Sequence, residues 1–217
     1  MLRAAKDSQP LSTGELTAAS AAPWRGGWLQ RARRCRSPNA GPRPAGVAVE
    51  LLLIHSISLP PGEYGGDAIE RLFTNRLDWD RHPYYAQIRG LRVSAHFLVR
   101  RDGELVQFVS CGRRAWHAGA SQWQGLADCN DYSIGIELEG LEGERFEAAQ
   151  YATLLELMRR LAARYPLRGV AGHEHVAPLR KLDPGRGFDW PQVMQGLAWP
   201  REFFPFELGA DLDSGSL

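Results

Sequence analysis

The segment GHEHVAPLRKLDPG, residues 172–185, concentrates side chains that can bind a metal ion or stabilise charge. Imidazole and carboxylate groups are common zinc ligands, and the ammonium group of Lys181 can stabilise a developing oxyanion. If the chain is extended up to His173, the side chains of His173 and His175 diverge, because successive residues of a strand point to opposite faces. We therefore do not expect these two histidines to bind one ion as a pair, and Asp183 and a distant histidine become the candidate partners of His173.

His55 is the matching histidine. It follows the apolar run VAVELLLI, residues 47–54, which is typical of a strand buried on both faces, and it precedes a loop rich in proline and glycine. His173 likewise follows a short apolar strand pattern, residues 167–172. Because both histidines come just past strand ends, we expect them to meet at one edge of a sheet, with Asp183 reaching back from its loop. Two imidazoles and one carboxylate form a catalytic zinc set that leaves a fourth position for water.

The strand pattern YSIGIELEG, residues 132–140, carries two carboxylates on one face, Glu137 and Glu139, and apolar side chains on the other. A carboxylate in a partly dry cleft can act as a general base, so Glu137 is the candidate that accepts the water proton. Lys181 is the candidate that stabilises the oxyanion of an acyl-transfer intermediate. The alternative for the two glutamates is a solvent-facing sheet edge.

The remaining patterns define the elements that must hold these residues in place. Residues 67–75 and 146–165 have helical spacing of apolar side chains, and residues 93–109 read as a hairpin that turns at Asp-Gly. His96 on this hairpin is interpreted as a hydrogen-bonded interior residue. The mixed order of strands and helices predicts a single α/β domain with a central mixed sheet flanked by helices.

Residues 113–125, RRAWHAGASQWQG, are predicted to form a loop. Trp116 and His117 in this loop are candidate walls of a cleft for a sugar or a peptide, because flat aromatic faces suit both. The alternative is a loop fixed in place by one buried tryptophan.

Composition excludes several classes of function. The chain has 217 residues, 44% of them hydrophobic, and a net charge of +1, so it lacks the basic excess typical of binding to nucleic acid or an anionic membrane surface. No apolar run reaches the ~20 residues of a membrane-spanning helix. The arginines of residues 31–36 are interpreted as a solvated surface. These are Arg31, Arg33, Arg34 and Arg36.

Cysteine usage points to a reducing compartment. The cysteines are Cys35, Cys111 and Cys129, an odd number without a CxxC pair, which favours free thiols over a disulfide framework. Charged residues and a proline interrupt any secretory signal in residues 1–26, which are expected to form a disordered extension. A cytoplasmic domain is then expected over residues 27–200, with residues 201–217 as a C-terminal tail.

Five blocks carry a resemblance to a known family. From about residue 27 to about residue 190, the chain resembles the amidase and peptidoglycan-recognition-protein superfamily, in particular the cytosolic 1,6-anhydro-N-acetylmuramyl-L-alanine amidases of Gram-negative bacteria. The blocks, in order, are IHSISLPPGEYGG, LRVSAHFLVRRDGELVQ, RAWHAGASQWQG, CNDYSIGIELEG and GHEHVAPLRKLDPG.

The resemblance implies site residues. It implies Zn²⁺ held by His55, His173 and Asp183, with Glu137 acting on the water and Lys181 on the oxyanion. It also implies four residues in the substrate cleft. These are Tyr84, Arg92, Trp116 and His117. The guanidinium of one of them, Arg92, suits a peptide carboxylate. Three positions depart from the familiar pattern, and they leave the metal set unchanged. These are Ser56, Asp128 and His175.

The implied reaction is hydrolysis of the amide bond between the lactyl group of 1,6-anhydro-N-acetylmuramic acid and L-alanine, in the recycling of cell-wall fragments. A monomer acting on anhydromuropeptides is expected, with an indirect effect on β-lactamase induction. Two alternatives remain open. One is an amidase that acts on intact murein, for which an export signal is expected. The other is a non-catalytic muropeptide-binding module, for which a missing metal ligand is expected.

Overall fold

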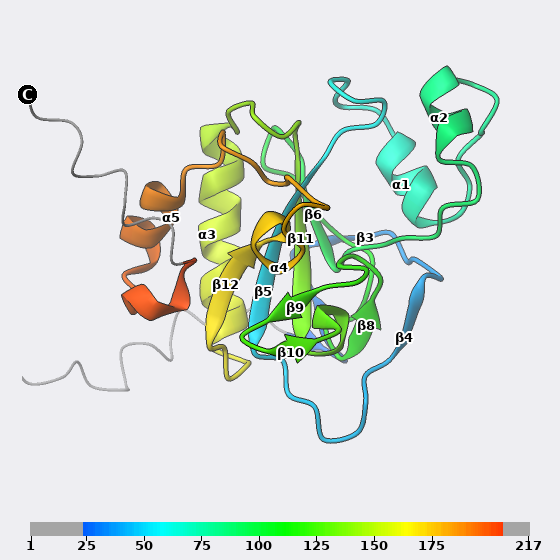
Figure 1. Cartoon of the computed structure of the whole chain (residues 1–217). Helices are drawn as coiled ribbons and strands as arrows, with labels where there is room; N and C mark the ends of the chain where they lie inside the picture. Colours follow the sequence, from blue (N-terminus) through cyan, green and yellow to red (C-terminus); the bar gives the residue numbers. More distant parts are fainter. Residues whose placement is uncertain (1–23, 206–217) are drawn as a thin grey trace, which may run out of the picture.

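A computed structural model of the chain describes residues 24–205, which fold around a mixed sheet (Figure 1). The six strands lie in the order β12-β5-β11-β6-β7-β3. The first four strands of this order are parallel, β7 is antiparallel to β6, and β3 is parallel to β7. The predicted α/β fold with a mixed sheet is therefore confirmed. The strand bounds are β3 (Arg33–Arg34), β5 (Leu51–Ile57), β6 (Phe97–Val99), β7 (Leu105–Gln107), β11 (Ser133–Glu139) and β12 (Gly169–Gly172).

The two longest helices cover one face of this sheet. Helix α3 (Ala148–Ala162) packs on the strands, and α5 (Trp190–Leu197) packs beside α3 (Figure 1). The apolar face of the helix predicted over residues 146–165 faces the sheet, and the helix ends shortly before Pro166, which cannot continue it. A buried cluster joins these helices to alternate residues of the central strands. Those strand residues are Leu52, Ile54, Phe97, Val99, Ile134, Ile136 and Leu138.

The opposite face of the sheet carries the polar residues. Glu137 and Glu139 lie on the face away from α3, as the alternation of β11 predicts, but both are buried, with 8% and 2% of their surface exposed. The alternative of a solvent-facing edge is therefore wrong. This face is covered by short elements and loops. They are α1 (Ala68–Phe73), α2 (Pro83–Gln87), α4 (His173–Val176), β4 (Ala40–Pro42), β8 (Arg113–Ala115), β9 (Gln122–Trp123), β10 (Leu126–Ala127) and the 3₁₀ helix η1 (Cys129–Asp131).

The predicted loop over residues 113–125 contains two short strands. β8 pairs with β4, and β9 pairs with β10 in a small hairpin. The strand pattern was missed because each strand has only two or three residues and its partner is either distant in the chain or equally short. The hairpin predicted over residues 93–109 is confirmed, since β6 and β7 pair around the Asp102-Gly103 turn.

Ordered structure continues on both sides of residues 27–200. β1 (Trp24–Arg25), at the end of the predicted extension, pairs with β2 (Trp28–Leu29). Within the predicted tail, the 3₁₀ helix η2 (Arg201–Phe203) leads to Phe204, which is only 3% exposed and belongs to the core. The other residues of the predicted extension and tail, 1–23 and 206–217, lie outside the described residues.

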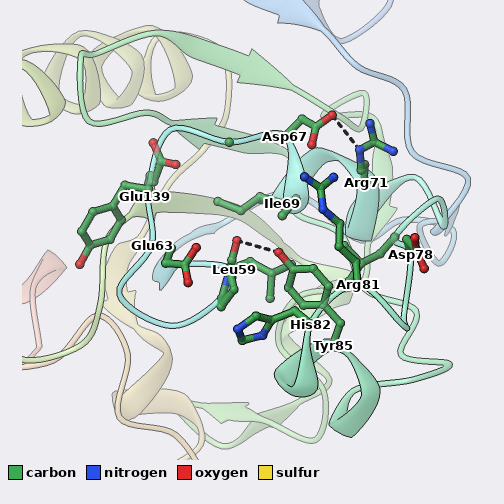
Figure 2. A pocket seen from close by; sticks show the side chains of 15 residues that line it. Leu59, Glu63, Asp67, Ile69, Arg71, Asp78, Arg81, His82, Tyr85 and Glu139 are labelled. Atoms are coloured by element: carbon green, nitrogen blue, oxygen red, sulfur yellow. Dashed lines mark hydrogen bonds and ion pairs between the residues drawn. The ribbon is translucent and has the colours of Figure 1, made fainter.

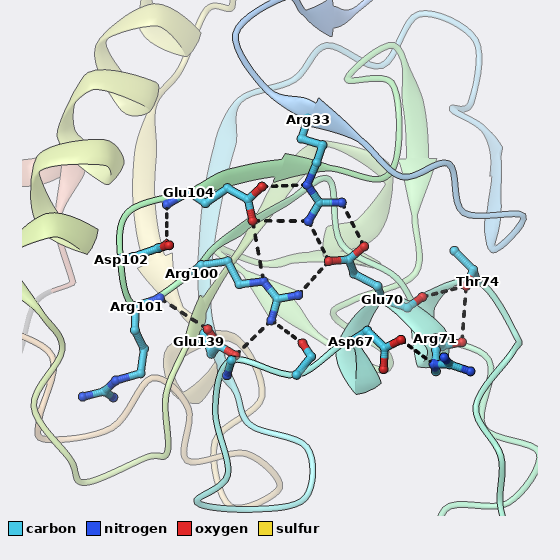
Figure 3. Close-up of polar contacts among 12 residues, drawn as sticks. Arg33, Asp67, Glu70, Arg71, Thr74, Arg100, Arg101, Asp102, Glu104 and Glu139 are labelled. Carbon is cyan, nitrogen blue, oxygen red and sulfur yellow. Dashed lines mark hydrogen bonds and ion pairs between the residues drawn. The ribbon is translucent and has the colours of Figure 1, made fainter.

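A network of ion pairs ties α1 to the sheet (Figure 3). Arg100, next to β6, donates to Glu70 of α1 at 2.6 Å and to Glu139 of β11 at 3.0 Å. Arg33 donates to Glu70 and to Glu104, so this member of the basic cluster is paired rather than merely solvated. Among residues 24–205, no helix is long and apolar enough to cross a membrane.

Candidate metal centre

Three side chains from distant parts of the chain converge at the end of the central strands. The Nδ1 atoms of His55 and His173 lie 3.1 Å apart. Oδ2 of Asp183 lies 3.0 Å from Nδ1 of His55 and 3.1 Å from Nδ1 of His173. The structure therefore brings together the three ligands that the sequence predicts, and they form the His-His-Asp group with metal-binding potential in the described part of the chain.

The local fold explains this convergence. His55 lies within β5 and not past its end, because the parallel ladder continues to Ile57 and pairs His55 with Glu137. His173 is the first residue of α4, directly after β12, as predicted. The loop that carries Asp183 is anchored to α4, since the backbone N–H of Glu174 donates to the carbonyl oxygen of Asp183 at 2.9 Å.

Gly172 allows this loop to approach. A Cβ atom at residue 172 would lie 2.7 Å from Cδ of Pro184, so a larger residue would push the Asp183 loop away from His173. Gly172 and His173, at the end of β12, thus supply both a ligand and the space that the Asp183 loop needs.

The donor set fits zinc. Zinc bonds of about 2.0–2.1 Å in tetrahedral geometry separate donor atoms by roughly 3.3 Å, close to the distances found here. Metal ligands must be unprotonated, and burial lowers the pKa of His55 to about 4, despite the opposing hydrogen bond with Asp183. Burial alone would raise the pKa of Asp183, but its hydrogen bonds with His173 and His55 hold that pKa well below its usual range. A neutral His55 and an ionised Asp183 are in the state that a divalent cation requires of its ligands.

The outward nitrogen of each imidazole is also engaged. Nε2 of His173 lies 3.0 Å from the carbonyl oxygen of Ala118. Nε2 of His55 lies 3.0 Å from Nδ1 of His117. The ring of His117 is buried behind His55, with only 9% of the residue exposed, and its predicted place in the substrate cleft stays a prediction.

Glu137 lies beside the donor group and carries an unsatisfied atom. Its Oε2 is buried and has no hydrogen-bond partner among the described residues. Burial, and then the charge of Asp183, raise the pKa of Glu137 well above its usual value, while the ammonium group of Lys181 opposes this rise. A buried carboxylate without a partner normally costs stability, so its presence indicates a role that a bound group completes.

The other predicted residues lie further out. Lys181 is half-buried, and its charge lowers the pKa of both His55 and Glu137. Tyr84 is half-buried on α2, Trp116 is half-buried next to His117, and Arg92 is exposed before β6. Within the described part of the chain, none of these last three makes a hydrogen bond to the donor group, and their role in substrate binding stays a prediction.

Two hollows are candidates for a substrate cleft. A groove of about 1110 Å³ has Lys181 in its lining, together with Glu174 and aromatic residues that include Trp123, Phe188 and Trp190. A smaller pocket of about 240 Å³ lies under the loop before α1, where Tyr85 donates to the carbonyl oxygen of Leu59 (Figure 2). The three donor residues line neither hollow, but Lys181 lines the large groove, which is therefore the better candidate for a substrate cleft.

The three departing positions stay outside the donor set. Oγ of Ser56 is buried without a hydrogen-bond partner in residues 24–205. Asp128 is exposed, with a left-handed backbone at the start of η1. Nδ1 of His175 accepts from the N–H of Gly172, and its ring packs against Trp190, which agrees with the prediction that His175 does not pair with His173.

Sequence reasoning missed residues that hold the site from behind. Asn130 accepts the backbone N–H groups of His117 and Ala118 on one oxygen, at 3.0 and 2.9 Å. Arg180 donates to the same Ala118 carbonyl that His173 contacts. Ser133 contacts Nε2 of His117 at 3.3 Å. No spacing rule in the sequence links these residues, because each acts through a contact between distant segments.

The chain matches known proteins over most of its length. The family described as N-acetylmuramoyl-L-alanine amidase matches residues 45–186. The 1,6-anhydro-N-acetylmuramyl-L-alanine amidase AmpD of Salmonella typhimurium (strain SL1344) is 53% identical over 168 residues, which cover 76% of this chain and 90% of that protein.

Solved structures of AmpD and AmiD are also similar to this chain. A crystal structure of a selenomethionine AmpD derivative is 50% identical, with a TM-score of 0.78, and the match covers 80% of this chain and 98% of that one. The amidase AmiD from E. coli, solved with anhydro-N-acetylmuramic acid-L-Ala-D-γ-Glu-L-Lys, is 31% identical, with a TM-score of 0.51. This second match covers 70% of this chain and 59% of AmiD.

Proposed function

Because this chain belongs to the N-acetylmuramoyl-L-alanine amidase family, we propose that it is a zinc-dependent amidase of cell-wall recycling. Its substrate is an anhydromuropeptide, and the bond it cleaves joins the lactyl group of 1,6-anhydro-N-acetylmuramic acid to L-alanine. The substrate assignment rests on the names of its relatives, AmpD and AmiD, both of which cover most of the matched domain.

One observation carries the proposal. Two imidazole nitrogens and a carboxylate oxygen lie 3.0–3.1 Å from one another, next to a buried carboxylate with an unsatisfied oxygen. His55, His173 and Asp183 would hold the zinc ion, which supplies Lewis acidity that polarises an amide carbonyl and makes water nucleophilic near neutral pH. A purely structural site would have four protein ligands and no need for Glu137.

The chain's own residues then have separate tasks. Glu137 accepts a proton from the attacking water and passes it to the leaving amine, because its raised pKa makes it able to hold that proton for part of the cycle. Lys181 places a positive charge beside the carbonyl oxygen as negative charge develops there. The large groove beside Lys181 offers aromatic faces to the sugar and polar groups to the peptide.

The setting follows from the same proposal. A cytoplasmic monomer would meet anhydromuropeptides as they are recycled, and by removing them would affect β-lactamase induction indirectly. Neither nucleic acid nor a membrane is a proposed partner, since the net charge is +1 and the described helices do not span a bilayer.

The test is direct. The purified protein is incubated with anhydro-N-acetylmuramic acid-L-Ala-D-γ-Glu-L-Lys, and the released tripeptide is followed by mass spectrometry. Release by the zinc-loaded protein, its loss with a chelator and its return with zinc are expected. Absence of release by zinc-loaded protein would support the non-catalytic binding module instead.

The same assay distinguishes the murein amidase. Intact sacculi are offered beside the soluble anhydromuropeptide at equal content of the cleaved bond. Preferred cleavage of the soluble substrate is expected, whereas equal or faster cleavage of sacculi would favour the alternative.

A further inference from the structure

His117 is a buried histidine that the proposed reaction does not use. Its ring meets His55 edge-on, with ring centroids 5.1 Å apart, and its Nδ1 lies 3.0 Å from Nε2 of His55. Its Nε2 lies 3.3 Å from Oγ of Ser133, and that hydroxyl donates to the carbonyl oxygen of Cys129 at 2.5 Å. These contacts form a continuous chain from the donor group into the protein interior.

The direction of this chain follows from its last member. The carbonyl of Cys129 can only accept, so the single hydroxyl hydrogen of Ser133 points to it. Oγ of Ser133 is then free to accept, and the proton of His117 sits on Nε2. This leaves Nδ1 of His117 without hydrogen, as the acceptor for the N–H at Nε2 of His55.

This hydrogen-bond chain determines which nitrogen of His55 is free to bind the metal ion. When Nε2 of His55 carries its hydrogen, Nδ1 keeps a lone pair, and Nδ1 is the atom that lies 3.0–3.1 Å from the other two donors. The opposite tautomer would place a hydrogen where the ion must bind. A hydrogen-bond partner on the far nitrogen also orients the ring and raises its basicity.

The backbone around His117 fixes the ring in this position. The N–H of His117 donates to Oδ1 of Asn130, which anchors the residue at its main chain. On the other side stands Gly135 of β11, where a Cβ atom would lie 2.5 Å from the imidazole. Glycine is therefore required at residue 135 to leave space for the ring, and the ring has little freedom to turn away from His55.

We propose that His117 is a positioning residue, which together with Ser133 sets the tautomer and orientation of His55 for zinc. The inference rests on the proposed zinc-dependent function. Neither residue is expected to touch the substrate, since both are buried behind His55.

The experiment measures zinc affinity by competition with a chromophoric chelator, in wild type and in four variants. His117→Phe keeps a ring but removes the acceptor. His117→Gln restores an acceptor oxygen, and Ser133→Ala removes the group that orients the His117 proton. His96→Phe is the matched control, because His96 is also buried, with its ring 5.7 Å from that of His117, and it hydrogen-bonds to Gly135 and Arg113 instead of a donor residue.

His117→Phe is expected to bind zinc roughly 10–100-fold more weakly than wild type. His117→Gln recovers part of the lost zinc affinity. Ser133→Ala also binds zinc more weakly than wild type, but by a smaller factor. His96→Phe lowers the melting temperature without a matching loss of zinc affinity. In the metal-free protein, long-range ¹H–¹⁵N NMR spectra report the His55 tautomer, and in Ser133→Ala the hydrogen moves toward Nδ1.

The inference is overturned if folded His117→Phe binds zinc as tightly as wild type. If that variant does not fold, an unchanged His55 tautomer and zinc affinity in Ser133→Ala overturn it. A wild type that binds no zinc refutes the proposed function as well, so the two failures are distinguishable.

Discussion

Glu137 and His55 lie directly opposite each other in the parallel ladder between β11 and β5. Paired residues of neighbouring strands point to the same face, so the buried carboxylate and the imidazole share the side of the sheet away from α3. A shift of one residue in this pairing would turn one of the two into the apolar core. The register of the sheet therefore sets the basic geometry of the site.

Glu137→Gln should separate proton transfer from metal binding. The amide keeps the size of the side chain but cannot take a proton, so tripeptide release should fall by about 10²–10⁴-fold while zinc remains bound. Glu139→Gln is the matched control, because Glu139 lies two residues along the same face but pairs with Arg100. This control should lower the melting temperature and retain most of the activity. Activity of Glu137→Gln near the wild-type rate would refute the assigned role.

The zinc set makes a prediction about stability. Zinc binds the folded chain in preference to the unfolded one, so adding it to chelator-treated wild type should raise the melting temperature, by an amount that grows with zinc concentration. In Asp183→Ala this rise and the turnover should both be lost, with an unchanged far-ultraviolet circular dichroism spectrum. Bound zinc is measured in parallel by metal analysis. Full zinc occupancy in Asp183→Ala would show that the ion is held elsewhere.

These two experiments test the part of the site that the sequence could predict. Local patterns point to three of the site residues. Glu137 is a polar residue within a strand pattern, His173 follows a strand pattern, and Asp183 precedes a proline and a glycine. The alternation of β11 correctly placed Glu137 opposite the apolar face. His55 was wrongly predicted to lie past the strand end, whereas β5 continues through it to Ile57, because the pairing that extends β5 depends on a partner strand that begins at residue 133.

The rest of the site depends on tertiary contacts that no local pattern reports. The sequence indicates only that His117 is an aromatic residue in a loop. The fold buries its ring in space that is available because residue 135 is glycine. Likewise Arg100 reads as an ordinary hairpin arginine, whereas the fold surrounds it with Glu70 and Glu139. Alternation and helical spacing indicate which face is apolar, but they do not specify which polar groups meet across it.

Lys181 should act on the reaction rather than on metal binding. Lys181→Met keeps the length of the side chain and removes its charge, so kcat should fall by about 10²-fold, in the range found when one oxyanion-stabilising group is removed. Zinc affinity should change little, because Lys181 is not in the donor set. Lys181→Arg, which keeps the charge, should recover part of the loss. A pure rise in KM with unchanged kcat would instead indicate that Lys181 only binds the substrate.

The ion-pair network beside the site predicts a loss of stability in acid. The hydrogen bond from Arg33 lowers the pKa of Glu70 to about 2, burial opposes this shift, and the hydrogen bond from Arg100 adds to it. Because the carboxyl group is more acidic in the folded than in the unfolded state, its contribution is complete above its ordinary pKa of 4.5 and is lost as the pH falls toward 2. Glu70→Gln should therefore be less stable than wild type near pH 6, by about 1–2 kcal/mol because solvent screens part of the interaction, and the difference should shrink below pH 4.

Urea unfolding of the metal-free protein between pH 2 and 6 measures this difference without interference from zinc release. Asp67→Asn provides the control, since Asp67 is more exposed and, among the described residues, its only ion pair is with Arg71 four residues along the chain. The Asp67→Asn curve should follow the wild type across the pH range. A constant gap between wild type and Glu70→Gln from pH 6 to pH 2 would show that the lost stability comes from packing and not from the charge of Glu70.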